Sequence, residues 1–389
     1  MHPVNIESVI PGMKLGVPIR DANENILLNR NIVITERYIN RLKSLGYQSV
    51  IILDDEDTAD LIVEDNISEH TRSVIRAKLK NSFELSEKMI REFKDESIKE
   101  VFKNIHSDKF KKNFNKIKIY ENLQGVIGQL IEQVLSNYVL NGLNSLKTYD
   151  NYTYNHSIDV VITSVMLGKK LGFSGSMLDE LAMGGLMHDI GKIFIDKKIL
   201  NKQDKLTPEE FEKIKEHPTF GYEIMSGRRI LASHVTYQHH ERQDGKGYPR
   251  GLKGNNKINR ETGVGLMSLF GEISAIADVH DAMISDRVYR KGFPPDIVIK
   301  FLINSAGVHL NRELLNKFLK FTPMYPVGYK IQILNGGYKD YFGVIAKINS
   351  ENLNRPIIRI LYDYNREKIE PKEIDLSKEK DIEIKCIKE

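Results

Sequence analysis

The pattern of apolar and polar positions divides the 389-residue chain into stretches of different texture. Near the N-terminus, short apolar runs such as ENILL and NIVI alternate with Pro and Gly, which indicates strands joined by turns. Thr35 precedes a helical repeat through Ile39, Leu42 and Leu45, and the strand SVIIL follows. The acidic run Asp54–Asp60 then ends what we interpret as a small α+β unit.

The stretch from about residue 68 to 147 is predicted to be helical and highly charged. One apolar stripe is expected at Leu85, Met89, Ile90 and Phe93, and a second begins at Ile127. Lys and Arg are dense between residues 72 and 118, which we interpret mainly as solvated helix faces. A signalling connector or a dimerising helix pair is an alternative that the pattern does not distinguish from this interpretation.

Helical periodicity continues from Asn151 to about Thr322, and the texture changes after Met324. The runs VGYKIQIL, YFGVIAKI and PIIRILYDY are typical of strands, and Asn335-Gly-Gly is typical of a hairpin turn. The overall prediction is therefore a mainly α chain with a small α+β unit at one end and a small β-rich unit at the other.

Composition narrows the classes of function. The charged fraction is 28%, the apolar fraction is 41% and the net charge is only +4, so composition gives no argument for nucleic-acid binding. The lone Cys386 excludes an internal disulfide and a zinc site built on several thiolates. The apolar runs are strand-sized and no signal peptide is visible, so we expect no membrane span and a cytoplasmic location.

Histidines are concentrated in the second helical stretch, which holds eight of the 11 in the chain. Several are predicted on or at the ends of separate helices, together with two aspartates: His156, His188, Asp189, His217, His239, His240 and Asp278. Imidazoles and carboxylates without thiolates favour Fe, Mn or similar ions. An Asp directly after a His can bridge two such metal ions. Two neighbouring metal ions can hold a hydroxide that attacks a phosphodiester.

Other histidines have simpler interpretations. A single His on an apolar helix is more often a hydrogen-bonded core residue than a ligand, and we interpret His234 and His280 in this way. The remaining ones lie outside any cluster and are expected at the surface: His2, His70, His106 and His309.

The motifs HDIGK (188–192) and HHERQDGKGYP (239–249) resemble the HD-GYP family, whose long motif reads HHExxDGxGYP. The resemblance covers roughly Asn155 to Thr322 and includes ILNKQDKLTPEEFEKIKEHP and AIADVHDAMISDRVYR. It implies a helical-bundle catalytic domain that hydrolyses cyclic di-GMP to pGpG, GMP or both, through a metal-bridging hydroxide.

Matching positions imply a role for each residue. One ion would be bound by His156, His188, Asp189 and Asp278, and a second by Asp189, His217 and one or both of His239 and His240. Lys192 would stabilise charge on the scissile phosphate, so the expected catalytic residues are Asp189 and Lys192. Expected substrate-binding residues are Lys192, Arg287, Arg290, Tyr248 and Asp244; surface pairing with Asp286 or Asp296 is the alternative for the two arginines. In the same loop, Gly245 and Gly247 would allow positive φ, and Tyr248 would stack on guanine.

The chain departs from the family pattern in three places. Tyr152 stands where some members have a Glu ligand, so two ions are expected and not three. The segment Asn255–Ser274 is longer than usual, which raises a question about substrate access. Val288 replaces a proline, a change that we expect to be minor.

The predicted division of the chain is therefore 1–55 (regulatory or interaction unit), 56–150 (helical connector), 151–324 (HD-GYP catalytic domain) and 325–389 (β-rich unit). Two other functions fit the same residues. One is hydrolysis of a different nucleotide, since metals bind phosphates and not bases. The other is a signalling module that binds a cyclic dinucleotide or a partner protein without turnover. Other signalling proteins and a second copy of the chain are further candidate partners, and nucleic acid is not expected.

Overall fold

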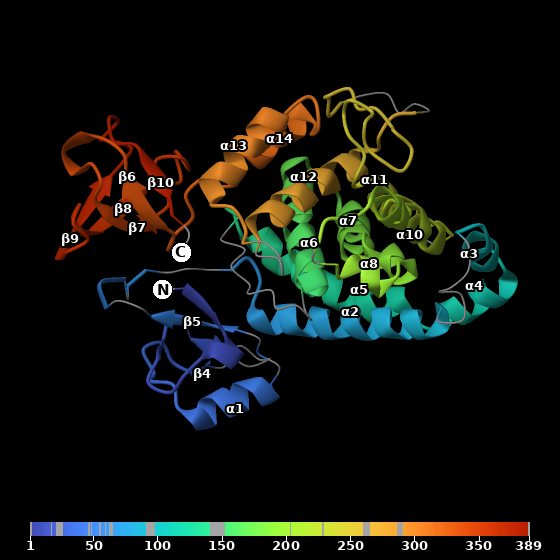
Figure 1. The fold of residues 1–389 in the computed structure, drawn as a ribbon, viewed down its shortest axis with the longest axis horizontal. Coiled ribbons are helices and arrows are strands. Elements are labelled where there is room, and N and C mark those ends of the chain that lie inside the picture. The colour runs from blue at the N-terminus through green and yellow to red at the C-terminus, as the bar shows by residue number, and fades with distance from the viewer. Residues whose placement is uncertain are drawn as a thin grey trace.

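The structure is a computed structural model that describes residues 2–16, 18–20, 26–45, 47, 49–53, 56–58, 60–61, 65–90, 98–140, 152–202, 204–227, 229–259, 265–285 and 291–387. A large helical body carries two small β-containing units at one end (Figure 1), which confirms the predicted mainly α class. Within the described residues, no helix has the length and apolar content needed to cross a bilayer.

The N-terminal unit is a small antiparallel sheet with one helix beside it. Strand β5 (Ser49–Leu53) lies between β1 (His2–Asn5) and β2 (Lys14–Leu15), and β3 (Ile19–Arg20) pairs with β4 (Ile26–Leu28). Helix α1 (Glu36–Ser44) begins as predicted. The hydroxyl of Thr35 accepts a hydrogen bond from the backbone N–H of Tyr38, and Ile39 and Leu42 are buried in the small core.

The helical body is built around one hydrophobic core that extends from Ile67 to Phe321. Its first helices are α2 (Glu69–Ile90), α3 (Ile98–Ile105), α4 (Asp108–Asn115) and α5 (Ile119–Ser136). The later ones are α6 (Tyr152–Lys170), α7 (Gly175–Met187), α8 (Lys197–Leu200), α9 (Pro208–Ile214), α10 (His217–Met225), α11 (Ile230–Gln238), α12 (Leu269–Ile284), α13 (Pro295–Ser305) and α14 (Arg312–Phe318). Helix α2 runs along the edge of this body (Figure 1) and packs against α5 and α6. The two sets of helices therefore share one interior.

Helix α2 buries a face that agrees with the predicted stripe only in part, since Ile90 is buried and Met89 packs against the core. Ile75, Leu79 and Phe83 point into the core at helical spacing, whereas Leu85, expected in the apolar stripe, is 38% exposed. Phe93 lies outside the described residues. The buried face begins with Arg72, whose side chain pairs with the buried Asp159 of α6 at 2.7 Å. Because a charged arginine lies on the inward face, the pattern of apolar residues does not identify which face of the helix is buried.

The C-terminal unit is a five-stranded antiparallel sheet in the order β10-β6-β7-β8-β9. The strands are β6 (Lys330–Ile333), β7 (Phe342–Lys347), β8 (Ile357–Tyr362), β9 (Lys368–Asp375) and β10 (Ile384–Cys386). The predicted turn at Asn335-Gly-Gly lies between β6 and β7, where residues 336–338 form a 3-10 turn. Arg359 of β8 binds the carboxylate of Asp60 at 2.5 Å, so this sheet lies beside the segment that leaves the N-terminal unit. The domain boundaries given above stay predictions.

Candidate metal centre

Five helical segments bring the predicted ligands to one point. His156 lies in the second turn of α6, and His188 and Asp189 follow the last residue of α7. A 3-10 helix, η5 (Ile190–Phe194), continues from there. A Cβ on Gly191 would collide with the carbonyl oxygen of His217, so this glycine lets η5 approach the start of α10. The glycine of HDIGK therefore brings two of the predicted ligand sites together.

The remaining ligands come from neighbouring helix ends. His217 is the first residue of α10, which follows the short helix α9. The predicted capping box between Thr207 and Glu210 is present at the start of α9, with Pro in its first turn. His239 and His240 follow the last residue of α11, and Asp278 lies in the third turn of α12.

The first ligand group surrounds His156. Its Nε2 lies 3.2 Å from Nε2 of His188 and 3.1 Å from Oδ1 of Asp278. Oδ2 of Asp189 lies 3.4 Å from Nε2 of His188. All four side chains are buried, and the donor atoms of His156, His188 and Asp189 lie within 4.8 Å of one another.

The second group surrounds His217. Its Nε2 lies 3.2 Å from Nε2 of His239 and 3.4 Å from Oδ1 of Asp189. His240 completes a cluster whose donor atoms also lie within 4.8 Å of one another, and its Nδ1 is 3.7 Å from Oδ2 of Asp278. Asp189 therefore presents one carboxylate oxygen to each group.

Hydrogen bonds orient four of the imidazoles. Three of them donate from Nδ1 to a backbone carbonyl oxygen: His188 to Gly185 (2.8 Å), His217 to Ile214 (2.7 Å) and His239 to Thr236 (2.9 Å). Nδ1 of His156 donates to the carboxylate of Asp281 at 2.6 Å. In the neutral form of each ring, Nε2 then carries a lone pair toward the centre, which is how protein structures usually orient a metal-binding histidine.

The charges of the centre follow from burial and from the mixture of groups. Burial lowers the pKa of His217, of His239 and of His240, the last to about 3, so these rings are neutral. Burial would raise the pKa of Asp189, but Lys192 and the neighbouring His188 hold it well below its usual range. Burial also opposes charge on His156, yet hydrogen bonds with Asp278 and Asp281 raise its pKa to about 9. The site thus places three neutral imidazoles, those of His217, His239 and His240, beside the ionised carboxylate of Asp189, while the pKa of His156 favours its protonated form.

The residues fit divalent metal ions. Oδ1 of Asp189 is buried and makes no hydrogen bond, although an orphaned carboxylate oxygen in a protein interior is costly. It faces His217 and His239, whose Nε2 atoms are acceptors in the tautomer described above. A cation would satisfy all of these atoms together, and a nitrogen and oxygen donor set suits Fe, Mn or a similar ion.

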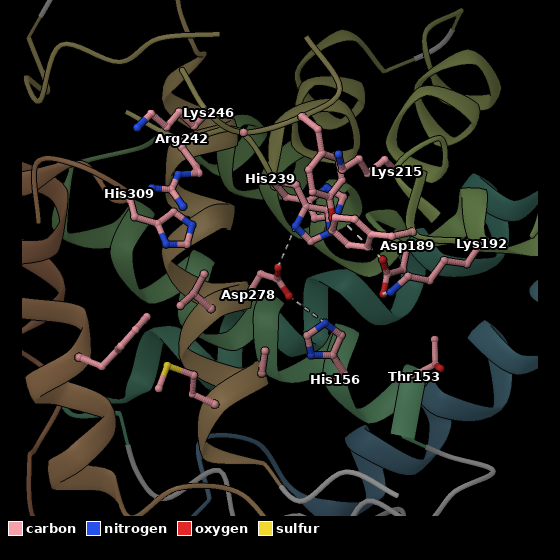
Figure 2. A pocket seen from close by; sticks show the side chains of 18 residues that line it. Thr153, His156, Asp189, Lys192, Lys215, His239, Arg242, Lys246, Asp278 and His309 are labelled. Atoms are coloured by element: carbon pink, nitrogen blue, oxygen red, sulfur yellow. Dashed lines mark hydrogen bonds and ion pairs between the residues drawn. The ribbon is translucent and has the colours of Figure 1, made fainter. Parts of the chain in front are cut away.

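A cavity of about 600 Å³ opens over the two groups. Lys192 and Lys215 lie on one side of it, and Arg242, Lys246 and His309 lie on the other (Figure 2). His309 was expected at the surface but is half-buried and lines the cavity, so that expectation is wrong. Sequence analysis also missed Phe211, Lys215 and Lys246 in the cavity wall, because no motif marks them.

Other predicted site residues are placed as follows. Lys192 lines the cavity and bonds to Oδ2 of Asp189 at 2.6 Å. The ring of Tyr248 lies 4.7 Å from that of His240, also in the cavity wall. Asp244 is not among the described residues that line the cavity, and Arg242 grips its carboxylate with two hydrogen bonds of 3.0 and 2.9 Å. Arg287 and Arg290 lie outside the described residues, as does the side chain of Tyr152.

The GYP loop uses its two glycines differently. Gly245 has a φ of +74°, as predicted. Gly247 does not have positive φ, which corrects the prediction. A Cβ on Gly247 would lie 2.5 Å from both the Cα of Glu241 and the carbonyl oxygen of His240. Gly247 is therefore required for close packing beside the ligand His240.

The long segment after this loop is shorter than expected, because α12 begins at Leu269 with Ser268 as its N-cap. Residues 260–264 of it lie outside the described residues. Its first part is anchored by Gln243, a buried side chain that donates to Glu272 at 2.7 Å and accepts from the backbone N–H of Asn256 at 3.0 Å.

The histidines outside the centre show mixed outcomes. His280 is buried against Phe318, as expected for a core residue. His234 is only half-buried, with a 3.1 Å hydrogen bond to Gln238, so it is not a core residue. His106 is exposed, as predicted, and pairs with Glu223.

Comparisons with known proteins agree with the geometry. A family model described as HD domain matches residues 136–314. The chain is 33% identical over 220 residues to a cyclic di-GMP phosphodiesterase of Pseudomonas aeruginosa, covering 56% of this chain and 50% of that protein. It is 37% identical over 187 residues to one of Thermotoga maritima (47% and 48%). It is also 34% identical over 163 residues to a 3'3'-cGAMP-specific phosphodiesterase of Vibrio cholerae (41% and 35%).

The chain thus spans about half or less of the length of these relatives. The matched parts include both histidine motifs and the helices that carry the two ligand groups. On this evidence residues 136–314 are similar to the HD domain family, and the matched stretch carries the two histidine motifs of the HD-GYP pattern.

Proposed function

We propose that this chain is a metal-dependent phosphodiesterase that hydrolyses cyclic di-GMP to linear pGpG, GMP or both. The observation that carries the proposal is the carboxylate of Asp189. It presents Oδ2 to the His156 group and Oδ1, which makes no hydrogen bond, to the His217 group. The names of the relatives in Pseudomonas aeruginosa and Thermotoga maritima support the choice of substrate.

Two divalent ions, Fe or Mn by preference, would be bound by the two groups. His156, His188, Asp189 and Asp278 would bind one, and Asp189, His217, His239 and His240 would bind the other. Bound ions would supply Lewis acidity and lower the pKa of the attacking water.

The protein's own side chains would do the rest. Lys192 lies in the cavity wall beside Asp189, where its ammonium group would stabilise charge on the phosphate. Arg287 and Arg290 would grip phosphate oxygens. Tyr248 offers a ring for stacking at the edge of the site, while Asp244 would act on substrate only through the loop and Arg242. The cavity is large enough for much of a dinucleotide.

The units outside the HD-GYP domain would regulate it. We propose that residues 1–55 and 325–389 bind other signalling proteins or a second copy of the chain. A substrate that serves as a bacterial second messenger would place the protein in the cytoplasm.

The test is hydrolysis of cyclic di-GMP by protein loaded anaerobically with Fe(II) or Mn(II), with the products separated by chromatography. The wild type should release pGpG or GMP. Asp189→Ala should lose both bound metal and activity, as measured by elemental analysis and product formation. Metal-loaded wild type that releases no product from cyclic di-GMP would overturn the proposal. Turnover of a different cyclic dinucleotide, or binding without turnover, would then be the function.

A further inference from the structure

One wall of the cavity carries an aromatic ring and a lysine that the metal chemistry does not use. Phe211 and Lys215 both line the cavity, and Figure 2 shows Lys215 on the same side as Lys192. Phe211 is 42% exposed, which is a costly position for a large apolar residue in water. Nζ of Lys215 lies 4.9 Å from the centroid of that ring and 5.9 Å from the centroid of Tyr248.

The local fold fixes this pair above the second ligand group. Helix α9 is held at its start by the capping box of Thr207 and Glu210, and Lys202 binds the carboxylate of Glu210 at 2.7 Å. The backbone N–H of Lys215 donates to the carbonyl oxygen of Phe211 at 3.0 Å. His217 begins the next helix two residues after Lys215, so the pair directly precedes a ligand of the second group in the chain.

The ion pair that Lys215 makes is a weak one, which a ligand can replace. The partner of Lys215 is Glu212 at 2.6 Å, whose side chain is 68% exposed, and such surface pairs contribute little. Across the cavity, by contrast, Arg242 makes two hydrogen bonds to a single carboxylate, that of Asp244. The ammonium group of Lys215 can therefore exchange its partner for an acceptor on a bound base.

We propose that Phe211 and Lys215 form a subsite for one purine of a cyclic dinucleotide and that this subsite prefers guanine; the proposal rests on the function proposed above. Stacking on Phe211 would accept either purine. Lys215 would distinguish them, because guanine presents two acceptors, O6 and N7, on one edge. Adenine presents N7 beside an amino group that donates. A cation fits the first edge and is repelled by the second.

The site alone does not decide which base is bound. Relatives of similar identity are named for cyclic di-GMP and for 3'3'-cGAMP. Bound ions and Lys192 would contact phosphate and would not distinguish the bases. A base preference must therefore come from the cavity wall, where Phe211 supplies a stacking surface and Lys215 supplies a charge. Nζ of Lys215 and the ring of Phe211 are close enough to act on one base.

The experiment compares kcat/KM for cyclic di-GMP and cyclic di-AMP in the wild type and in Lys215→Met, Phe211→Leu and Phe211→Trp. Lys215→Met should reduce the preference for the guanine substrate about tenfold or more, the loss expected for one charge-assisted hydrogen bond. Phe211→Leu should lower kcat/KM for both substrates about fivefold or more. Phe211→Trp keeps an aromatic ring and should retain the wild-type values. The control Lys213→Met removes an exposed lysine of the same helix and should change neither value.

Bound Mn(II), measured by elemental analysis, should be equal in all of these variants and shows that the centre is intact. An unchanged substrate ratio in Lys215→Met, or a wild type that prefers adenine, overturns the subsite. Calorimetric binding of the same two dinucleotides to Asp189→Ala separates this proposal from the proposed function. If the wild type hydrolyses neither substrate, a guanine preference in binding that disappears with Lys215→Met supports the subsite while the phosphodiesterase proposal fails. Equal binding of both dinucleotides overturns the subsite.

Discussion

Replacing Arg72 by Met should destabilise the helical body by about 3–5 kcal/mol, because the change removes the cation that pairs with a buried carboxylate. Nη1 of Arg72 lies 2.7 Å from Oδ1 of Asp159, and the two side chains are 1% and 0% exposed. Nη2 also binds Asp65, but that carboxylate is 32% exposed and remains hydrated in the variant. The cost therefore comes mainly from Asp159, while Met keeps much of the apolar stem of the arginine.

Two further variants separate charge from packing. Arg76→Met removes the next arginine along α2, which is also buried but pairs with Glu69, a side chain 36% exposed. Its loss should cost only about 1 kcal/mol, since Glu69 stays in contact with water. The double variant Arg72→Met/Asp159→Asn removes both charges and should be more stable than Arg72→Met by roughly 2 kcal/mol.

The assay is urea unfolding followed by circular dichroism at 222 nm, with the free energy of unfolding taken from the midpoint and slope. The reasoning is wrong if Arg72→Met lies within about 1 kcal/mol of the wild type, or if Arg72→Met and Arg76→Met are equally destabilised. It is also wrong if the second substitution makes the double variant less stable than Arg72→Met.

Three other predictions concern the centre. Lys192→Ala should keep its metal by elemental analysis and lose about 10²–10³-fold in kcat, whereas the exposed Lys198→Ala should lose nothing; metal loss would make Lys192 a structural residue. Asp281→Asn should weaken Mn(II) binding about 10–100-fold by calorimetry, because it weakens the 2.6 Å hydrogen bond that orients His156; unchanged affinity would contradict this role. Gly247→Ala should lower stability by about 1–3 kcal/mol and reduce turnover, because its Cβ would meet Glu241 and the carbonyl of His240. Gly227→Ala, where a Cβ would meet nothing within 4 Å, is the control, and equal melting temperatures for the two variants would refute the packing argument.

The centre could be predicted from the sequence because its ligands lie in short motifs at helix ends. His188 and Asp189 are adjacent, as are His239 and His240, so each pair reaches the site through a single turn of chain. His309 could not be predicted. Its loop is placed by backbone hydrogen bonds across a long separation, from the N–H of Gln243 to the carbonyl of His309 at 3.1 Å and from Asp244 to Val308 at 2.9 Å.

The limits of prediction along α2 have a different cause. A dense run of Lys and Arg normally indicates a solvated face, and this interpretation is wrong for Arg72 and Arg76, which are buried. Arg72 pairs with Asp159, which is far away in the sequence, and Arg76 pairs with Glu69, which lies two helical turns earlier. The sequence pattern does not reveal either pairing. The β-rich tail was easier to predict, because alternating apolar residues and Asn335-Gly-Gly are local signals.

The buried ion pair between Arg72 and Asp159 also limits which fragments of the chain can fold alone. The family model begins at residue 136, yet α2 ends at Ile90 and supplies Ile75, Leu79 and Phe83 to the same core as α6 and α7. A fragment limited to residues 136–314 would expose that core and leave Asp159, one turn from His156, without the guanidinium of Arg72. The helix before the HD domain is therefore part of the scaffold of the metal centre. A displacement of α2 would act on α6, and through it on the candidate ligand His156, without any contact to the substrate.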